Sequence, residues 1–211
     1  MRNLRRLMRK NPKAFWLTAG GLGLATLTAA VTILFMIPEV RVLWHFYWGQ
    51  YYYEKAQQDE SFYHKSLEEF DKAIRMSTDY DWLALVGRGT VQGKLNKSQE
   101  QLNDCKRATE ENEEFALAWN CLGVALHSLG QHGEAIAAFD KATYWARENE
   151  ALASTEKRIE VEIEATYNKG DALLNNKQED EAIATLEGAL KLAQDNQAEE
   201  FNHFLYNLLA R

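Results

Sequence analysis

Residues 116–149 read ALAWNCLGVALHSLGQHGEAIAAFDKATYWAREN, and they show the clearest helical pattern in the chain. The first half places apolar residues on one helical face, at Trp119, Leu122, Gly123 and Leu126. Leu129 and Gly130 end that helix, and a second helix carries Ala135, Phe139 and Ala142 at steps of four and three. Small residues at Gly123 and Ala135 allow two antiparallel helices to approach, while Trp119 and Phe139 fill the space between turns. The stretch therefore predicts a helical hairpin.

This pattern resembles the tetratricopeptide repeat, whose signature is W-x2-L-G-x2-Y, then A-x3-F-x2-A and a proline. Leu126 stands in the place of the tyrosine, and Arg147 stands in the place of the proline. The resemblance implies a hairpin that stacks on similar hairpins to form an α-solenoid.

Three further units extend the pattern. Residues 82–115 repeat it 34 positions earlier, with Gln101 in place of the small alanine, and residues 39–81 form an imperfect first unit. Residues 150–196 repeat it after 47 positions, and the extra residues around 151–162 predict a first helix that is extended at its start. The run Ile159–Ile163 also alternates like a strand, but no partner strand is evident nearby. An amphipathic stripe over residues 197–211 predicts a capping helix. We expect an all-α fold of about four hairpins.

An uncharged segment precedes the repeats. Residues 14–38 lack charged side chains, and the 24 residues from Ala14 to Ile37 would reach roughly 36 Å as a helix. The segment predicts a transmembrane signal anchor; a cleaved signal peptide is the alternative, with a poor small-x-small site at Thr28–Ala30. Gly21, Ala25 and Ala29 are small residues spaced four apart on this segment. They indicate either a surface on which a second membrane helix packs or the ordinary composition of a membrane helix.

The charge distribution predicts an orientation and excludes one class of partner. Residues 1–13 hold six basic residues and no acids, which places this tail in the cytoplasm and the repeats on the periplasmic or lumenal side, in a bacterial inner membrane or a thylakoid. The rest of the chain, with 18 Lys and Arg against 31 Asp and Glu, carries -13. Such an acidic body argues against binding to nucleic acid.

The family resemblance implies a concave face, lined by first helices, that binds peptides or partner helices. The repeat spacing assigns nine residues to this groove: Val86, Thr90, Asn120, Val124, His127, Tyr167, Asn168, Asp171 and Asn175. Co-chaperone members of the family clamp a terminal carboxylate with lysine and asparagine residues at fixed positions. Val86 and Thr90 occupy two of those positions here, so the resemblance does not imply a chaperone C-terminus as the ligand.

An aromatic stretch follows the uncharged segment. Seven of the ten residues from Trp44 to Tyr53 are aromatic, and they predict a membrane-proximal surface of Trp44, Tyr47, Trp48, Tyr51 and Tyr52. One interpretation is an interfacial belt that merges into the core of the first repeat. The other is a docking surface for a membrane partner.

The sequence predicts neither an enzyme nor a cofactor or metal site. The histidines are scattered, and His127 and His132 are five residues apart, which is the wrong spacing for two ligands on one helical face. The glutamates of residues 148–164 are interpreted as a solvated helix face. Cys105 and Cys121 lie eight residues on either side of Glu113, so they form either a disulfide between adjacent helices or two thiols, with that of Cys105 buried.

The leading functional hypothesis is a membrane-anchored scaffold that binds a partner protein during assembly or chaperoning of a membrane or exported complex. It resembles anchored repeat proteins of secretion, cytochrome maturation and photosystem assembly. One alternative is a constitutive accessory subunit that packs through its transmembrane helix. A second alternative is a receptor for targeting signals.

Overall fold

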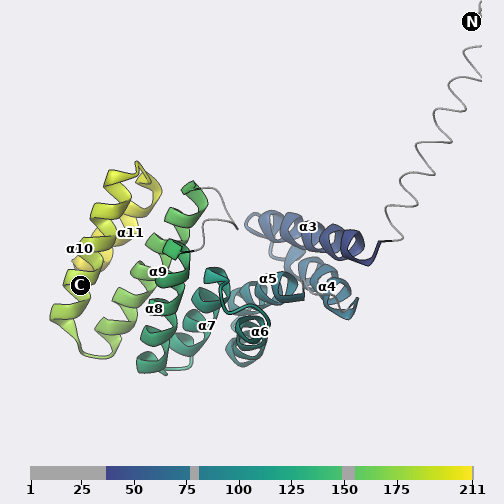
Figure 1. Ribbon diagram of the computed structural model, residues 1–211, viewed down its shortest axis with the longest axis horizontal. Coiled ribbons are helices and arrows are strands. Elements are labelled where there is room, and N and C mark those ends of the chain that lie inside the picture. Colours follow the sequence, from purple (N-terminus) through teal and green to yellow (C-terminus); the bar gives the residue numbers. More distant parts are fainter. Residues whose placement is uncertain (1–36, 77–80, 149–154, 211) are drawn as a thin grey trace, which may run out of the picture.

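The computed structural model describes residues 37–76, 81–148 and 155–210, and every regular element in these ranges is an α-helix. The helices follow one another as antiparallel hairpins that stack in chain order, from α3 and α4 at one end to α10 and α11 at the other (Figure 1). Their bounds are α3 Pro38–Ala56, α4 Phe62–Arg75, α5 Asp81–Lys94, α6 Ser98–Glu111, α7 Ala116–Ser128, α8 His132–Glu148, α9 Thr155–Asn175, α10 Glu179–Asp195 and α11 Glu199–Leu209. The described chain is thus an all-helical solenoid.

The turns inside three hairpins share one backbone geometry. Asn96, Gly130 and Lys177 each adopt a positive φ, of 57°, 78° and 62°. The next residue then donates its N–H to a carbonyl five positions back, as Gln131 does to Leu126 at 2.9 Å. These turns are 34 and then 47 residues apart, which is the spacing of the sequence pattern.

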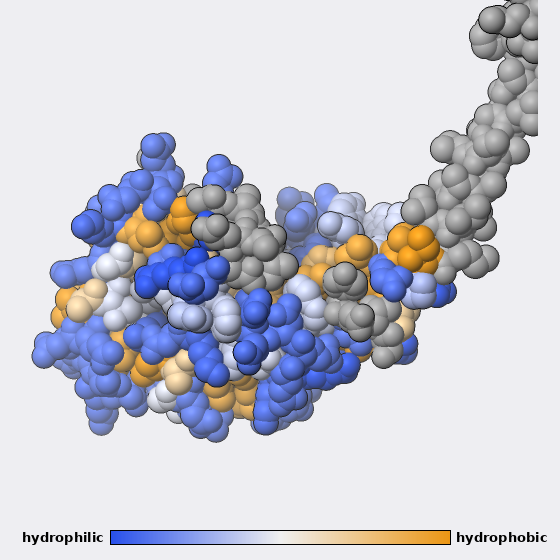
Figure 2. All heavy atoms as spheres, in the orientation of Figure 1, coloured by the Kyte–Doolittle hydropathy of each residue, from blue (hydrophilic) through white to orange (hydrophobic). Residues whose placement is uncertain are grey.

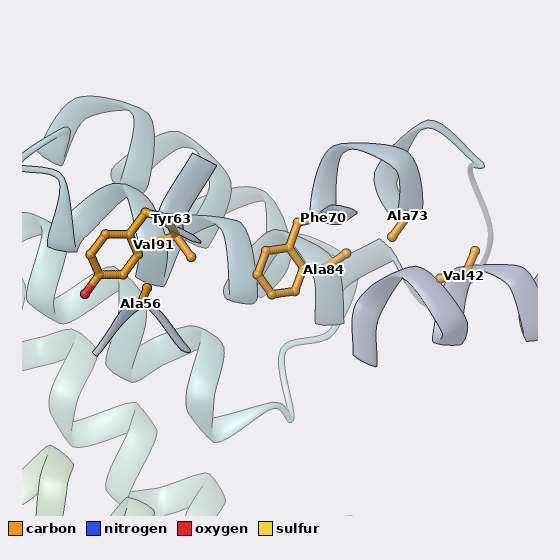
Figure 3. Packing of buried hydrophobic residues seen from close by; sticks show 7 residues of the cluster. All are labelled: Val42, Ala56, Tyr63, Phe70, Ala73, Ala84 and Val91. Carbon is orange, nitrogen blue, oxygen red and sulfur yellow. The ribbon is translucent and has the colours of Figure 1, made fainter. Parts of the chain in front are cut away.

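In three of the hairpins, a large buried side chain of the second helix lies against a glycine of the first helix. Phe139 of α8 is 1% exposed and lies against Gly123 of α7, where an added Cβ would fall 2.5 Å from a ring atom. Phe70 of α4 has the same function in the first hairpin, and Figure 3 shows it beside Ala84 of α5. The glycine and the aromatic ring therefore set how closely the two helices approach.

An arginine joins three helices at the start of the stack. The Arg88 guanidinium of α5 donates two hydrogen bonds of 2.7 Å to Asp104 of α6 and one of 2.6 Å to Asp71 of α4. The carboxylates hold the pKa of Arg88 above its usual range, with Asp104 making the largest contribution. The bidentate pair with Asp104 fixes the orientation of the Arg88 side chain and compensates its positive charge.

A disulfide joins Cys105 of α6 to Cys121 of α7, with the two Cα atoms 5.6 Å apart. Both residues are buried, and Gly89 of α5 lies directly over the two sulfur atoms. Of the two alternatives for these cysteines, the structure has the bridge, which connects the second helix of one hairpin to the first helix of the next.

The transmembrane helix expected over residues 14–38 requires correction. Within the three described ranges, no helix combines the length and the apolar character that crossing a bilayer requires. Residues 14–36 lie outside the described residues, as do Gly21, Ala25 and Ala29. The expected fold class is accordingly corrected to an all-helical solenoid, and neither the expected anchoring helix nor the expected periplasmic or lumenal location of the repeats is supported by the described residues.

Pro38, the last residue of that expected segment, instead begins α3. Its fixed φ suits the first turn of a helix, and Glu39 lies in the same turn. Val42, four residues further, is buried beside Ala73 of α4 (Figure 3). This helix is therefore the first described element of the solenoid.

The hairpin of α9 and α10 has a first helix longer than those of the two hairpins before it. α9 contains 21 residues against 14 in α5, and Ile159 to Ile163 are helical, not extended. Glu162 is buried and pairs with Arg147 of α8 at 2.6 Å. The interpretation of residues 148–164 as a solvated face is therefore wrong for Glu162, because α9 turns this position toward α8. Leu205 and Leu208 of α11 pack on α9 and α10.

Candidate functional site

A groove of about 380 Å³ lies on the inner side of the stacked first helices. α3 contributes to one side and α9 to the other, while α5, α6 and α7 supply the remaining surface. Its lining is formed by Tyr53, Val86, Thr90, Gly93, Lys94, Gln101, Leu117, Asn120, Cys121, Val124, Ser128 and Glu164. Apolar and polar side chains alternate over this surface, which suits a ligand that presents both backbone groups and apolar side chains.

Four of the nine residues expected in the groove line it: Val86, Thr90, Asn120 and Val124. Asn168 of α9 lies next to them, and its amide Nδ2 donates to Asn120 Oδ1 at 3.1 Å. Asn120 is buried, whereas Val124 is only half-buried and can be reached by a ligand. The hydrogen-bonded amide pair connects α7 to α9.

His127, Asp171 and Asn175 form a separate polar cluster with His132. His127 Nε2 lies 3.2 Å from Asp171 Oδ2, and its Nδ1 lies 3.1 Å from His132 Nδ1. Asn175 donates to the Asp171 backbone carbonyl at 2.8 Å. These side chains contact one another and do not line the groove.

The turn at Gly130 brings His127 and His132 together, although their spacing excludes them from one helical face. Tyr167, the remaining expected groove residue, packs against the core formed by α9, α10 and α11.

Glu164 is a groove residue that the sequence interpretation missed. It lies on α9, faces the groove with Tyr53 and Asn120, and keeps access to solvent through the groove. Enclosure by the surrounding helices removes water and raises the pKa of the Glu164 carboxyl, while the hydrogen bond from Asn120 and the charge of Lys94 oppose this shift. Desolvation likewise raises the pKa of the Tyr53 hydroxyl, and the nearby Tyr63 and Glu164 add to it. Glu164 is thus a solvent-exposed carboxylate in the lining of the groove, and the pKa of its carboxyl is raised.

Exposed aromatic side chains form a second surface on α3. Trp44, Tyr47, Trp48 and Tyr51 line a shallow depression of about 380 Å³, and Tyr47 is 68% exposed. Tyr52, which the sequence assigns to the same surface, adjoins Trp48 and Tyr51 with ring centroids 5.7 and 5.5 Å away, and it also stacks on Phe62 of α4 at 6.0 Å. On the face of the molecule that Figure 2 shows, hydrophilic residues cover much of the surface and hydrophobic residues lie between them.

The chemistry that the described residues offer is that of binding. Among them, no group of three or more His, Cys, Asp or Glu side chains is placed to hold a metal ion. The groove presents side-chain amides, hydroxyls, one carboxylate, one ammonium group and apolar walls, which can form hydrogen bonds and apolar contacts with a ligand.

Comparison with known proteins identifies the repeats. Residues 116–149 and 163–196 match the tetratricopeptide repeat family. These ranges correspond to the hairpins α7–α8 and α9–α10, so the family interpretation is supported for this part of the chain, whereas anchoring by an N-terminal helix is not. No curated protein sequence matches the chain significantly.

Solved structures share the fold at low sequence identity. One is "YrrB: a TPR protein with an unusual peptide-binding site", with a TM-score of 0.55 and 19% identity, covering 92% of this chain and 94% of that one. Another is MamA from Desulfovibrio magneticus RS-1, with a TM-score of 0.54 and 17% sequence identity. The match covers 75% of this chain and 77% of that one. A third is the anaphase-promoting complex hetero-tetramer Cut9–Hcn1, with a TM-score of 0.56 and 17% sequence identity. The match covers 96% of this chain and 38% of that one. At these identities the likeness shows the fold alone.

Proposed function

We propose that this protein is a binding adaptor whose groove holds an extended or helical segment of a partner protein during assembly or chaperoning of a protein complex. The observation that carries the proposal is the groove between α3 and α9, in which the Asn120–Asn168 amide pair lies beside the apolar side chains of Val86 and Val124. An enzyme is not proposed, because the described groove residues include no nucleophile paired with a base.

The shape and chemistry of the groove suit polypeptide. Rigid stacked helices hold the lining residues in place, so little conformational entropy is lost when a ligand binds. Side-chain amides can pair with the N–H and carbonyl groups of an extended segment, and Val124 and Leu117 offer contacts to its apolar side chains. The peptide-binding site named for YrrB is compatible with this function on the same fold.

A constitutive subunit of a protein complex is the second candidate function. The aromatic surface of α3 favours it, because Trp and Tyr side chains dominate the energetics of permanent interfaces. In this case a partner protein would cover Trp44, Tyr47 and Trp48 permanently, and the groove would contribute little. Recognition of targeting signals, the third hypothesis from the sequence, would use the same groove and belongs with the leading proposal.

Site-specific photocrosslinking distinguishes these functions. A photoreactive residue is placed at Val124 in the groove, at Tyr47 on α3, or at Tyr144, a 55% exposed control position on α8. The adaptor function predicts one dominant protein adduct at Val124 and none at Tyr144. A dominant adduct at Tyr47 alone would instead indicate the constitutive subunit, and equal labelling at all three positions would overturn both proposals.

A further inference from the structure

We propose that a second pocket, formed where the starts of α5, α7 and α9 meet the end of α8, binds a small carboxylic acid with a compact apolar group. This end pocket has a volume of about 220 Å³. Leu117 is the one described residue that lines both the end pocket and the groove, so the two sites are distinct. The inference therefore does not depend on the proposed binding of a polypeptide in the groove.

The walls of the end pocket are mostly apolar. They are formed by the side chains of Leu83, Phe115, Leu117, Trp145 and Val161. The Phe115 ring packs edge-on against Trp82, with ring centroids 4.4 Å apart, which holds this wall in place. Because an apolar cavity of about 150 Å³ already admits a benzene ring, the end pocket has room for one ring and a short chain. Its walls therefore select a small apolar group.

Arg158 places an unsatisfied guanidinium group at this pocket. Its Nε is buried without a hydrogen-bond partner, and within the described residues its one hydrogen bond runs from Nη1 to the Arg147 carbonyl oxygen at 3.4 Å. The neighbouring cations are already paired, Arg147 with Glu162 at 2.6 Å and Lys157 with Glu160 at 2.8 Å. A buried donor without an acceptor is costly, and the planar guanidinium fork matches a carboxylate. A ligand carboxylate would supply the acceptor that Arg158 lacks.

The start of α7 adds further donors. Phe115 caps this helix without a side-chain hydrogen bond, and the backbone N–H groups of Ala116 and Leu117 find no acceptor among the described residues. All three residues line the end pocket, and the first N–H groups of a helix attract an anion. Glu114 and Lys157 also line it, but both are exposed to solvent. The less exposed polar groups of the pocket are thus donors.

An apolar carboxylic acid satisfies both parts of the end pocket. Its apolar group would cover the walls, while its carboxylate would accept hydrogen bonds from Arg158 and from the start of α7. A neutral apolar ligand would leave the guanidinium unsatisfied, and a small inorganic anion would leave the apolar walls in contact with water.

Isothermal titration calorimetry on the full-length protein tests the inference. The probe is hydrocinnamate, which is compared with hydrocinnamamide, of the same shape but without charge, and with propanoate, which lacks the ring. The wild type is expected to bind hydrocinnamate about tenfold more tightly than either comparison compound. Arg158→Gln should bind the acid and the amide equally. The control Arg107→Gln, at an arginine that is 47% exposed on α6, should keep the preference of the wild type.

Ala116→Phe provides a second variant, because Ala116 lines the end pocket and a ring at this position would fill it. This variant is expected to bind neither the acid nor the amide, and circular dichroism checks that its helices are intact. Three results would overturn the inference: no binding of hydrocinnamate at millimolar concentration, equal affinity of the wild type for acid and amide, or an unchanged preference in Arg158→Gln. Tighter binding of a short peptide that ends in phenylalanine would overturn the assignment to a small molecule.

Discussion

Replacing Gly123 by alanine tests the packing that defines the hairpin. The new Cβ would lie 2.5, 2.6 and 2.8 Å from three atoms of the Phe139 ring, where carbon atoms normally stay about 3.5–4.0 Å apart. Phe139 is 1% exposed, so its ring can move only by displacing its neighbours. Overpacking of this kind destabilises a core by about 1–3 kcal/mol, and the better helix propensity of alanine returns about 1 kcal/mol. We expect Gly123→Ala to lower the free energy of unfolding by about 1 kcal/mol.

Gly188→Ala is the matched control. Gly188 also lies inside a helix, α10, but an added Cβ there meets no atom within 4 Å. This variant should therefore show only the gain in propensity and be about 1 kcal/mol more stable than the wild type. Urea-induced unfolding followed by circular dichroism measures both differences. If Gly123→Ala were as stable as Gly188→Ala, the ring of Phe139 would have room to spare and the close packing would be refuted.

Three further predictions use the same unfolding assay. Arg88→Met leaves Asp104 unpaired and should lower the free energy of unfolding by about 3 kcal/mol. Arg107→Met changes an arginine that is 47% exposed and should lower it by less than about 1 kcal/mol. Equal losses in the two variants would contradict the importance assigned to the Arg88–Asp104 pair. Lys177→Gly should gain about 1 kcal/mol, because Lys177 holds a φ of 62° that disfavours side chains, and a loss would argue against that turn. Glu164→Gln should be more stable than the wild type at pH 7. The pKa of Glu164 is raised in the folded protein, so ionisation of this carboxyl disfavours the fold at a pH above that pKa. The advantage of the variant should therefore shrink as the pH falls toward 4. An advantage that grew in acid would contradict the direction of the shift.

The hairpins could be predicted because their packing is local in sequence. Gly123 and Phe139 are 16 residues apart on adjacent helices, so a periodic pattern with one turn is enough to bring them together. Val86 and Asn120 could be placed in the groove for the same reason, since each lies on the first helix of its hairpin.

The remaining features depend on how the helices pack against one another, which a periodic sequence pattern does not reveal. Glu164 faces the groove because of how α9 is rotated against α7, and a run of glutamates offers no sign of that rotation. His127 and His132 were excluded as neighbours on one helix, although the reversal at Gly130 places them on two helices that touch. The membrane prediction relied on hydropathy alone, in a segment almost wholly outside the described residues.

The bridge between Cys105 and Cys121 has a mechanical consequence. In a stack where each hairpin touches only its neighbours, unravelling proceeds from either end, one unit at a time. The covalent link closes a backbone ring over a sequence separation of 16, and a pulling force on the two ends cannot open that ring. At roughly 3.5 Å per residue, about 55 Å of chain would be missing from the stretched length until a reductant is added. The centre of the solenoid is thus its load-resistant section, and the outer hairpins extend first.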